Sequence, residues 1–171
     1  SQTGMTIGDS FADVLLGKAY PSGKLASTWA KWEEYCSVGE FAQLDDTRYN
    51  EGIYVGYRYF DSVGKEPLFP FGFGLGYTTF EVGQPQVEVA GTQVRVTVPV
   101  KNTGTALGKE VVQLYVSLPS GKLDQPYQVL AAFEKTSQLA PGQEEALTLA
   151  FALESLASFD ESTAAFILEA G

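Results

Sequence analysis

Few side chains in this sequence could carry chemistry, and the most suggestive of them stand in one stretch. Glu51 lies among aromatics and glycines in YNEGIYVGYRYFD (49–61), where a shielded carboxyl group could act as a general acid or base. Arg48 and Arg58 stand close enough in sequence to hold Glu51 in a hydrogen bond or ion pair instead. We prefer that structural role for Glu51.

Two further sets of residues could bind a ligand. Trp29 and Trp32 could stack on the apolar face of a sugar ring, but aromatic side chains more often pack a domain interior, and we favour packing. Gly72, Gly74 and Gly76 have the spacing of a phosphate loop. Such a loop needs a strand before it, a helix after it and usually a lysine. Here YTTF (77–80) follows and favours a strand, so no phosphate site is predicted.

The overall composition excludes several classes of site. The chain of 171 residues has a net charge of −10, no histidine and one cysteine, Cys36. The acidity argues against nucleic-acid and anionic-membrane partners, which need basic patches. The lack of histidine removes the commonest general base and metal ligand, and a single cysteine excludes an internal disulfide. We therefore expect no metal and no cofactor.

The stretch from Tyr49 to Phe80 is the most unusual part of the chain. It holds ten aromatic residues separated by six glycines. Aromatic rings bury large areas, and glycine lets the backbone turn sharply or approach a surface closely. This pattern predicts a glycine-kinked ribbon packed between two bodies as a clamp. The aromatics are spread evenly along it, which favours a clamp over a single sugar pocket, and Arg58 should pair with a carboxylate or carbonyl group.

Strands follow the ribbon. Val94, Val96, Val98 and Val100 alternate with polar residues, which indicates a half-buried strand. Similar patterns predict strands at about 110–117, 127–133, 147–153 and 166–168. The predicted core consists of the residues on their apolar faces: Val94, Val96, Val98, Val100, Val112, Leu114, Val116, Leu147, Leu149, Phe151 and Leu153. Turn signals between short strands indicate an antiparallel β-sandwich that starts near residues 82–87.

Residues 1–48 follow a different pattern. Ser10 could cap a short helix through Phe11, Val14 and Leu15 that ends at Gly17. After PSGKL (21–25), where Lys24 lies in a turn, residues 25–29 could form a strand and residues 31–35 a helical turn. So few apolar repeats cannot bury a core of their own. We therefore expect this segment to be the tail of a larger α/β domain.

Several motifs resemble one family. GDSFADVLLGKAYPSGKLASTW (8–29), YNEGIYVGYRYFD (49–61) and PLFPFGFGLGYTTF (67–80) resemble the end of the α/β sandwich domain of family 3 glycoside hydrolases, the β-glucosidase and β-xylosidase family. KNTGTALGKEVVQLYVS (101–117), LAAFEKTSQLAPGQ (130–143) and LASFD (156–160) resemble its fibronectin type III-like domain. The resemblance implies a mainly β chain with a partial α/β sandwich domain at 1–80, including the ribbon 49–80. It also implies a fibronectin type III-like domain at 81–171, which we expect to lack its last strand.

The resemblance also implies what the chain does not carry. Members of the family are retaining glycosidases that need two carboxyl groups about 5–5.5 Å apart. Their nucleophilic aspartate lies on an (α/β)8 barrel, and their acid/base glutamate lies upstream of the motifs seen here. Glu51 aligns with neither. We therefore assign no catalytic, substrate-binding or metal-binding residue, and we expect the partners to be the barrel and the remaining α/β sandwich of a parent enzyme.

Two functions remain open at this point. The chain is either the non-catalytic portion of a retaining β-glycosidase that hydrolyses terminal β-linked sugars, or a stand-alone module that binds carbohydrate or protein. A sandwich fold does not decide between them. The first 48 residues do discriminate, because a self-sufficient module would not begin with a segment that cannot bury its own apolar face. The sequence therefore favours the glycosidase portion.

Overall fold

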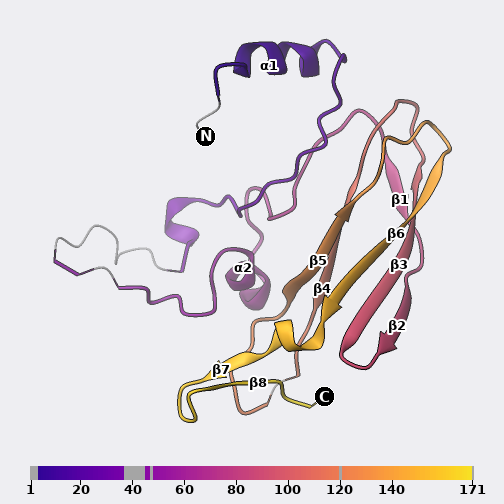
Figure 1. Cartoon of the computed structure of the whole chain (residues 1–171). Helices are drawn as coiled ribbons and strands as arrows, with labels where there is room; N and C mark the ends of the chain where they lie inside the picture. The colour runs from indigo at the N-terminus through magenta and orange to yellow at the C-terminus, as the bar shows by residue number, and fades with distance from the viewer. Residues whose placement is uncertain (1–3, 37–44, 47, 120, 171) are drawn as a thin grey trace.

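The computed structural model describes residues 4–36, 45–46, 48–119 and 121–170. An irregular N-terminal part leads into a β-sandwich, and a small hairpin closes the chain below it (Figure 1). The helical elements are α1 (Ile7–Leu15), η1 (Trp32–Glu34), α2 (Tyr57–Val63) and η2 (Leu153–Leu156). The strands are β1 (Phe80–Val82), β2 (Gln86–Ala90), β3 (Gln93–Asn102), β4 (Val111–Val116), β5 (Val129–Lys135), β6 (Glu144–Ala152), β7 (Ser158–Asp160) and β8 (Ala165–Ile167). The predicted mainly β, antiparallel architecture is confirmed.

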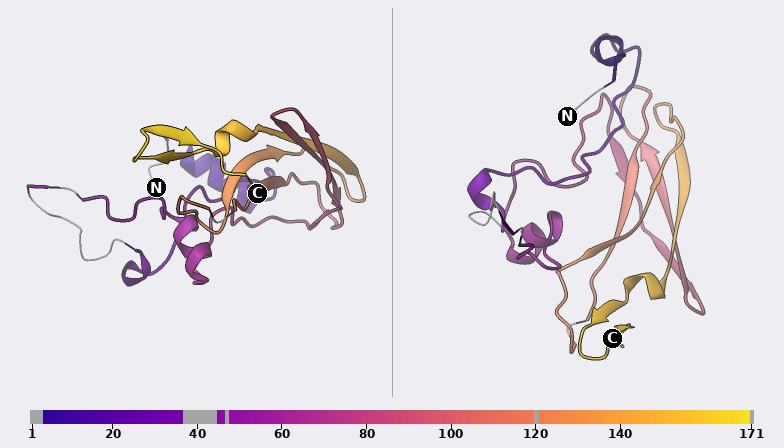
Figure 2. Two further views of the ribbon diagram at one scale, coloured as in Figure 1. Left: turned by 90° about the horizontal axis from the view of Figure 1, so that it is seen from below. Right: turned by 60° about the vertical axis from the view of Figure 1, so that its left-hand side comes forward.

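The sandwich is built on β3. β1 and β2 pair with successive stretches of one edge of β3, and β6 pairs with the other edge along its whole length. β4 and β5 form a separate two-stranded sheet. The two views of Figure 2 show the sandwich with α2 beside it and the hairpin of β7 and β8 at one end.

The core lies between β3, β6 and the β4–β5 sheet. Val98, Val100, Leu147 and Leu149 form a buried cluster, with Phe80, Val112, Leu114 and Ala132 packed against it. The alternation predicted for β3 is confirmed, since all four of its valines are buried. The rest of the predicted core is only half-buried, in the case of Val112, Leu114, Val116, Phe151 and Leu153. Leu153 lies in η2, beyond the end of β6.

β4 shows why the prediction of one core was too simple. Burial does not alternate along β4. All of its residues are half-buried, because both faces of the strand are covered. Val112 and Leu114 pack on the core, whereas Tyr115 on the other face contacts the ring of Tyr57 in α2. A strand between two layers reads as half-buried throughout.

The valines of β2 are a second departure from a complete sandwich. Val87 and Val89 pair across the ladder with Val96 and Val94, so they share the core-facing side of the sheet. They are nevertheless 62% and 65% exposed. The β4–β5 sheet therefore leaves the β2 side of the first sheet uncovered.

The structure of the N-terminal part corrects two local predictions and confirms two others. Ser10 does not cap α1, because its N–H donates to the Thr6 carbonyl oxygen inside the helix at 2.9 Å. Gly17 does follow the end of the helix, with φ +70°. Residues 25–29 form no regular strand and make a single bridge from Trp29 to Phe69. The helical turn predicted at 31–35 is confirmed by η1, whereas α2 was not predicted within the ribbon.

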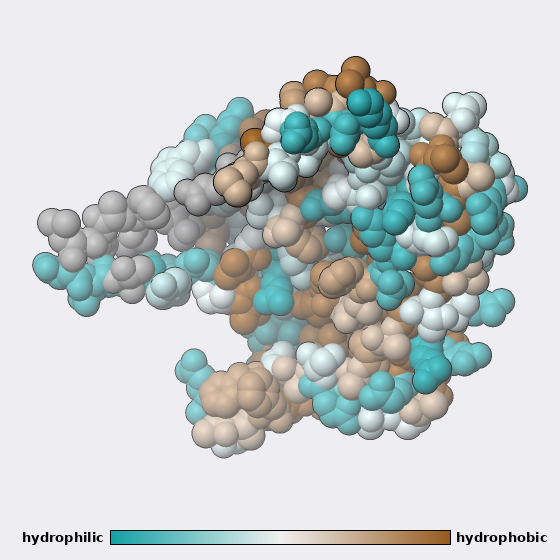
Figure 3. Space-filling view, turned by 45° about the horizontal axis from the view of Figure 1, so that its top comes forward, coloured by the Kyte–Doolittle hydropathy of each residue, from teal (hydrophilic) through white to brown (hydrophobic). Residues whose placement is uncertain are grey.

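The apolar stripe of α1 has no cover among the described residues. Met5, Ile7, Phe11, Leu15 and Leu16 are all exposed, and no residue of α1 is buried. In Figure 3, brown apolar side chains gather at the surface at the top of the molecule, where α1 lies in Figure 1. An amphipathic helix normally buries such a stripe, so the N-terminal part does not complete a core of its own.

Candidate functional site

Among the described residues the N-terminal part meets the sandwich at several places, and the first is an ion pair. Lys24 Nζ lies 2.6 Å from Glu110 Oε1 in front of β4, and both side chains are about three-quarters buried (23% and 22% exposed). Lys135 Nζ, at the end of β5, donates to Ser22 Oγ at 2.7 Å. The Lys24 side chain thus lies between the two parts of the chain. Its ion pair with Glu110 gives this lysine a structural role at the junction.

Two glycines make close approach possible at this contact. A Cβ on Gly76 would collide with the hydroxyl of Tyr20, and one on Gly108 would lie 2.9 Å from the Tyr20 ring. Real Cβ atoms almost never come so close, so the Tyr20 ring fills a slot that only glycine leaves open. Burial and the Glu110 charge raise the pKa of Tyr20, which keeps this phenol neutral. Close packing here confirms one function predicted for the ribbon glycines.

The second contact lies along α2. The Leu130 N–H donates to Tyr57 Oη at 2.8 Å, and Gln128 Nε2 donates to Asp61 Oδ2 at 2.9 Å. The Tyr127 N–H donates to Ser62 Oγ at 2.9 Å. One face of α2 therefore satisfies polar groups at the start of β5, as a clamp requires.

Aromatic rings fill the space behind these hydrogen bonds. Tyr57 stacks on Phe71 with ring centres 4.9 Å apart and meets Tyr115 of β4 edge-on at 5.7 Å. Burial, followed by the nearby Tyr57 and Asp61, raises the pKa of Tyr115 to about 12. The three rings Tyr57, Phe71 and Tyr115 are all half-buried. The ribbon thus contacts the sandwich through packed rings as well as hydrogen bonds.

A loop of the sandwich reaches back to the ribbon from the side of the hairpin. The Tyr54 hydroxyl donates to both oxygens of Asp124, at 2.9 and 2.8 Å, and this hydrogen bond raises the pKa of Tyr54. The loop that carries Asp124 is itself held from the other side by the C-terminal hairpin.

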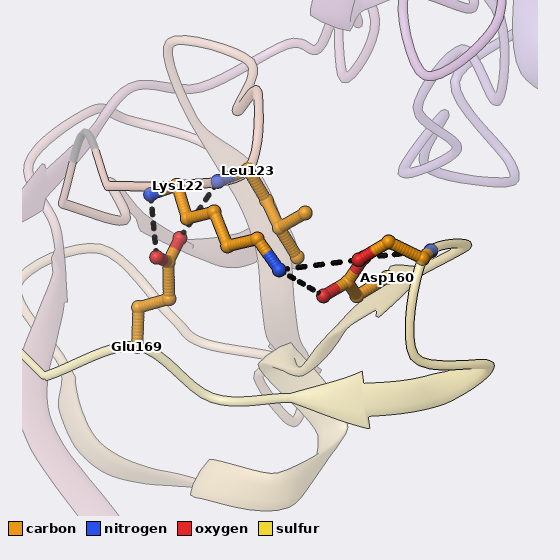
Figure 4. Close-up of polar contacts among 5 residues, drawn as sticks. Lys122, Leu123, Asp160 and Glu169 are labelled. Atoms are coloured by element: carbon orange, nitrogen blue, oxygen red, sulfur yellow. Dashed lines mark hydrogen bonds and ion pairs between the residues drawn. The ribbon is translucent and has the colours of Figure 1, made fainter.

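Figure 4 shows how the hairpin holds that loop. Lys122 Nζ lies 2.5 Å from Asp160 Oδ2, and the backbone N–H groups of Lys122 and Leu123 donate to the Glu169 carboxylate at 2.6 and 3.2 Å. Asp160 is buried and also accepts the N–H and hydroxyl of Ser162. The Lys122 hydrogen bond, helped by Ser162, lowers the pKa of Asp160 well below its usual range.

A cavity of about 730 Å³ opens on the side of the ribbon that faces residues 26–36. We call it the aromatic cavity. Its walls include Thr28, Trp29, Tyr35, Glu51, Tyr54, Tyr57, Arg58, Tyr59 and Phe71. The ribbon tyrosines are evenly spaced in sequence, yet the turn at Gly56 and the helix α2 bring three of them to one hollow.

The predicted pairing of Glu51 and Arg58 is wrong. Among the described residues, the ion pairs do not include Glu51, Arg48 or Arg58. Glu51 and Arg58 are both half-buried. The side chain of each makes no hydrogen bond to the rest of the described chain, and both line the aromatic cavity. The short separation in sequence suggested that Glu51 and Arg58 would be in contact. In the structure Arg58 lies in α2, and the two side chains line the aromatic cavity without pairing.

The other candidate residues, Trp29, Trp32 and Cys36, are exposed. Trp29 is 53% exposed, packs edge-on against Phe69 and donates to Ser27 Oγ at 3.1 Å. Trp32 is likewise exposed. Cys36 is free and exposed, and burial followed by the Glu51 charge raises the pKa of its thiol. A raised pKa makes a thiol less reactive at neutral pH.

Metal and membrane signals are also lacking in the part of the chain that the structure describes. Residues 4–36, 45–46, 48–119 and 121–170 contain no group of three or more acidic, cysteine or histidine side chains placed to hold a metal ion. The same residues contain no helix long and apolar enough to cross a membrane.

Comparison with known proteins identifies both parts of the chain. Residues 1–77 match the glycosyl hydrolase family 3 C-terminal domain, and residues 110–171 match a fibronectin type III-like domain. β-Glucosidase A of Butyrivibrio fibrisolvens is 43% identical over 195 residues, covering 99% of this chain and 23% of that protein. A β-glucosidase of Ruminococcus albus is 45% identical, covering 94% of this chain and 17% of that protein.

Solved structures agree with these matches. β-Glucosidase 3B of Thermotoga neapolitana superposes with a TM-score of 0.86 at 43% identity, over 93% of this chain and 23% of that one. The β-glucosidase of Kluyveromyces marxianus in complex with glucose gives a TM-score of 0.90 at 36% identity, over 96% and 20%. The chain thus spans about a fifth of the length of the proteins that it resembles.

Proposed function

Since the chain belongs to glycosyl hydrolase family 3, with residues 1–77 matching its C-terminal domain and residues 110–171 a fibronectin type III-like domain, we propose that it serves a retaining β-glucosidase-like enzyme as a non-catalytic, domain-clamping portion. The parent enzyme would hydrolyse terminal β-linked sugars from oligosaccharides or glycosides. The ribbon and α2 would fix the fibronectin-like sandwich to the α/β domain.

The observation that carries the clamp is the pair of contacts on either side of the ribbon. Lys24 bonds to Glu110 at one end, and Tyr57 and Asp61 bond to the start of β5 at the other. Two separated attachment points resist rotation of one part against the other, whereas one would act as a hinge. Because domain interfaces are mobile by default, such a double attachment favours a rigid junction.

We propose that the partners are the barrel and the remaining α/β sandwich of the same enzyme. The uncovered apolar stripe of α1 supports this, because Phe11 and Leu15 are 63% and 65% exposed and need a partner of matching chemistry. We further propose that the part at 1–80 gives way to the part at 81–171 at β1, which begins at Phe80 and pairs with β3. The exposed Val87 and Val89 offer a second apolar face that such a partner could cover.

Activity of the isolated chain tests the non-catalytic role. We expect no turnover of nitrophenyl β-glucoside or β-xyloside above buffer, since the two carboxyl groups of a retaining glycosidase would lie outside this chain. Glu51→Gln is the matched control for the one tempting carboxylate. Turnover that copurifies with the chain and disappears in Glu51→Gln would overturn the proposal.

A further inference from the structure

A short loop at residues 121–128 bonds to the C-terminal hairpin as well as to the ribbon, and we call it the bridging loop. Glu169 holds its backbone, because the N–H groups of Lys122 and Leu123 donate to this one carboxylate at 2.6 and 3.2 Å (Figure 4). A Cβ on Gly121 would collide with the Glu169 carboxylate, so a side chain there would push the carboxylate away from these N–H groups. Glu169 and the glycine together fix the path of the loop.

Two side-chain contacts add to the hold of the hairpin. Lys122 Nζ lies 2.5 Å from Oδ2 of the buried Asp160. Gln125 Nε2 donates to Ser158 Oγ of β7 at 2.9 Å. Because Lys122 and Gln125 stand before and after Asp124 in sequence, the hairpin fixes the bridging loop on both sides of Asp124.

Asp124 itself bonds to the ribbon and not to the hairpin. The Tyr54 hydroxyl donates to both of its carboxylate oxygens, at 2.9 and 2.8 Å. The Tyr54 N–H donates to the Glu51 carbonyl oxygen at 2.9 Å, which closes the ribbon turn that carries this tyrosine. Asp124 is exposed, and ordering an exposed side chain costs conformational entropy. Its bond to Tyr54 therefore depends on how firmly the backbone of the bridging loop is held.

We propose that the C-terminal hairpin is a latch on the ribbon, with Glu169 and Asp160 as positioning residues that place Asp124 for Tyr54. The latch sets the ribbon turn at 51–54 from the far end of the fibronectin-like part, although no hairpin residue bonds to Tyr54 in the described part of the chain. It rests on the proposed clamp, to which it adds an indirect attachment. The clamp contacts of Lys24 and α2 are direct, so they do not need the hairpin.

Amide hydrogen exchange of the whole chain, followed by NMR, tests the latch. The Tyr54 N–H reports on the ribbon turn. The Gly72 N–H, which donates to the Leu25 carbonyl oxygen at 2.8 Å, reports on the ribbon away from the bridging loop. Glu169→Ala should speed exchange at Tyr54 by about threefold to tenfold, the effect of losing one hydrogen bond to a charged group. Exchange at Gly72 should stay as in the parent chain.

Two further variants trace the effect to the proposed path. Tyr54→Phe removes the last bond of the latch and should speed exchange at residue 54 equally. Adding Glu169→Ala to Tyr54→Phe should then change the rate little, because both substitutions break one path. Glu145→Ala is the matched control, since the Glu145 carboxylate also accepts a backbone N–H, that of Ser137 at 2.8 Å, but at the start of β6. It should leave exchange at Tyr54 unchanged.

Other outcomes would overturn the latch. Equal exchange at Tyr54 in Glu169→Ala and in the parent chain would show that the hairpin does not position the loop. A parallel rise at Gly72 would show that the hairpin contributes only to overall stability. Should Glu169→Ala fail to fold, Asp160→Asn weakens the same hold and gives the same comparison. None of these results touches the direct contacts of α2 with β5, so the latch can fail while the proposed clamp stands.

Discussion

The sandwich and the N-terminal part both contain segments with periodic apolar residues, but only the sandwich buries them. β3 and β6 bury Val100 and Leu149 at 0% and 2% exposure, whereas α1 leaves an equally apolar stripe in solvent. The sandwich strands meet each other within the chain, so their apolar faces are covered. The helix contacts the ribbon where the Tyr77 hydroxyl donates to the Val14 carbonyl oxygen, but no described element covers its apolar stripe. Apolar periodicity thus predicts which residues share a face, but a second layer decides whether that face becomes a core.

The largest expected effect separates these halves directly. Leu149→Ala should destabilise the sandwich by about 2–5 kcal/mol, because it leaves a cavity in the buried cluster. Leu15→Ala, the same substitution on exposed α1, should change stability by less than about 0.5 kcal/mol. Urea unfolding of both variants measures the difference. Similar costs would mean that α1 is covered or that β6 faces the other way.

A substitution at the junction of the two parts should have an effect on stability between those of the core and surface substitutions. Phe71→Ala removes a half-buried ring that stacks on Tyr57 and should cost about 1–3 kcal/mol. It should also expose apolar surface to a fluorescent dye, since the ribbon would loosen from β4. Phe166→Ala on exposed β8 is the matched control and should do neither. A Phe71→Ala chain that behaves like Phe166→Ala would leave the clamp without its aromatic contact.

The C-terminal hairpin adds a dependence on pH. The lowered pKa of Asp160 means that the unfolded chain takes up a proton, near a pKa of about 3.9, before the folded chain does. The stabilisation is therefore fully present above that pH and decreases as the pH falls below about 4. Asp160→Asn should flatten this decrease in a series of unfolding curves, whereas Asp9→Asn on α1 should not. An unchanged profile in Asp160→Asn would show that the Lys122 contact does not persist in solution.

The ion pair between the halves should give the smallest effect. Lys24 and Glu110 are partly exposed, so a double-mutant cycle with alanine should give a coupling of about 0.5–1 kcal/mol. The coupling should decrease at high salt. A coupling near zero would show that the ion pair does not contribute to the attachment and that the contacts of α2 and Tyr54 hold the junction.

The sequence predicted best where one periodic strand meets one layer. The β3 valines alternate because a strand points successive side chains to opposite faces, and that geometry needs no knowledge of the partner. Gly17 ends α1 for an equally local reason, since its φ of +70° suits glycine. The prediction that Ser10 caps the helix was wrong. Serine is common at helix starts, but this helix begins one turn earlier, at Ile7.

Other features were decided by tertiary structure alone. Val87 is surface rather than core because the β4–β5 sheet does not cover it, and β4 is half-buried throughout because α2 covers its outer face. The fold also separated Glu51 from Arg58 and gathered evenly spaced tyrosines around one cavity. The sequence by itself determined the main strands of the sandwich, the glycine-rich ribbon and the family. Which side chains meet across the junction was decided only by packing, because pairing between distant segments leaves no local period in the sequence.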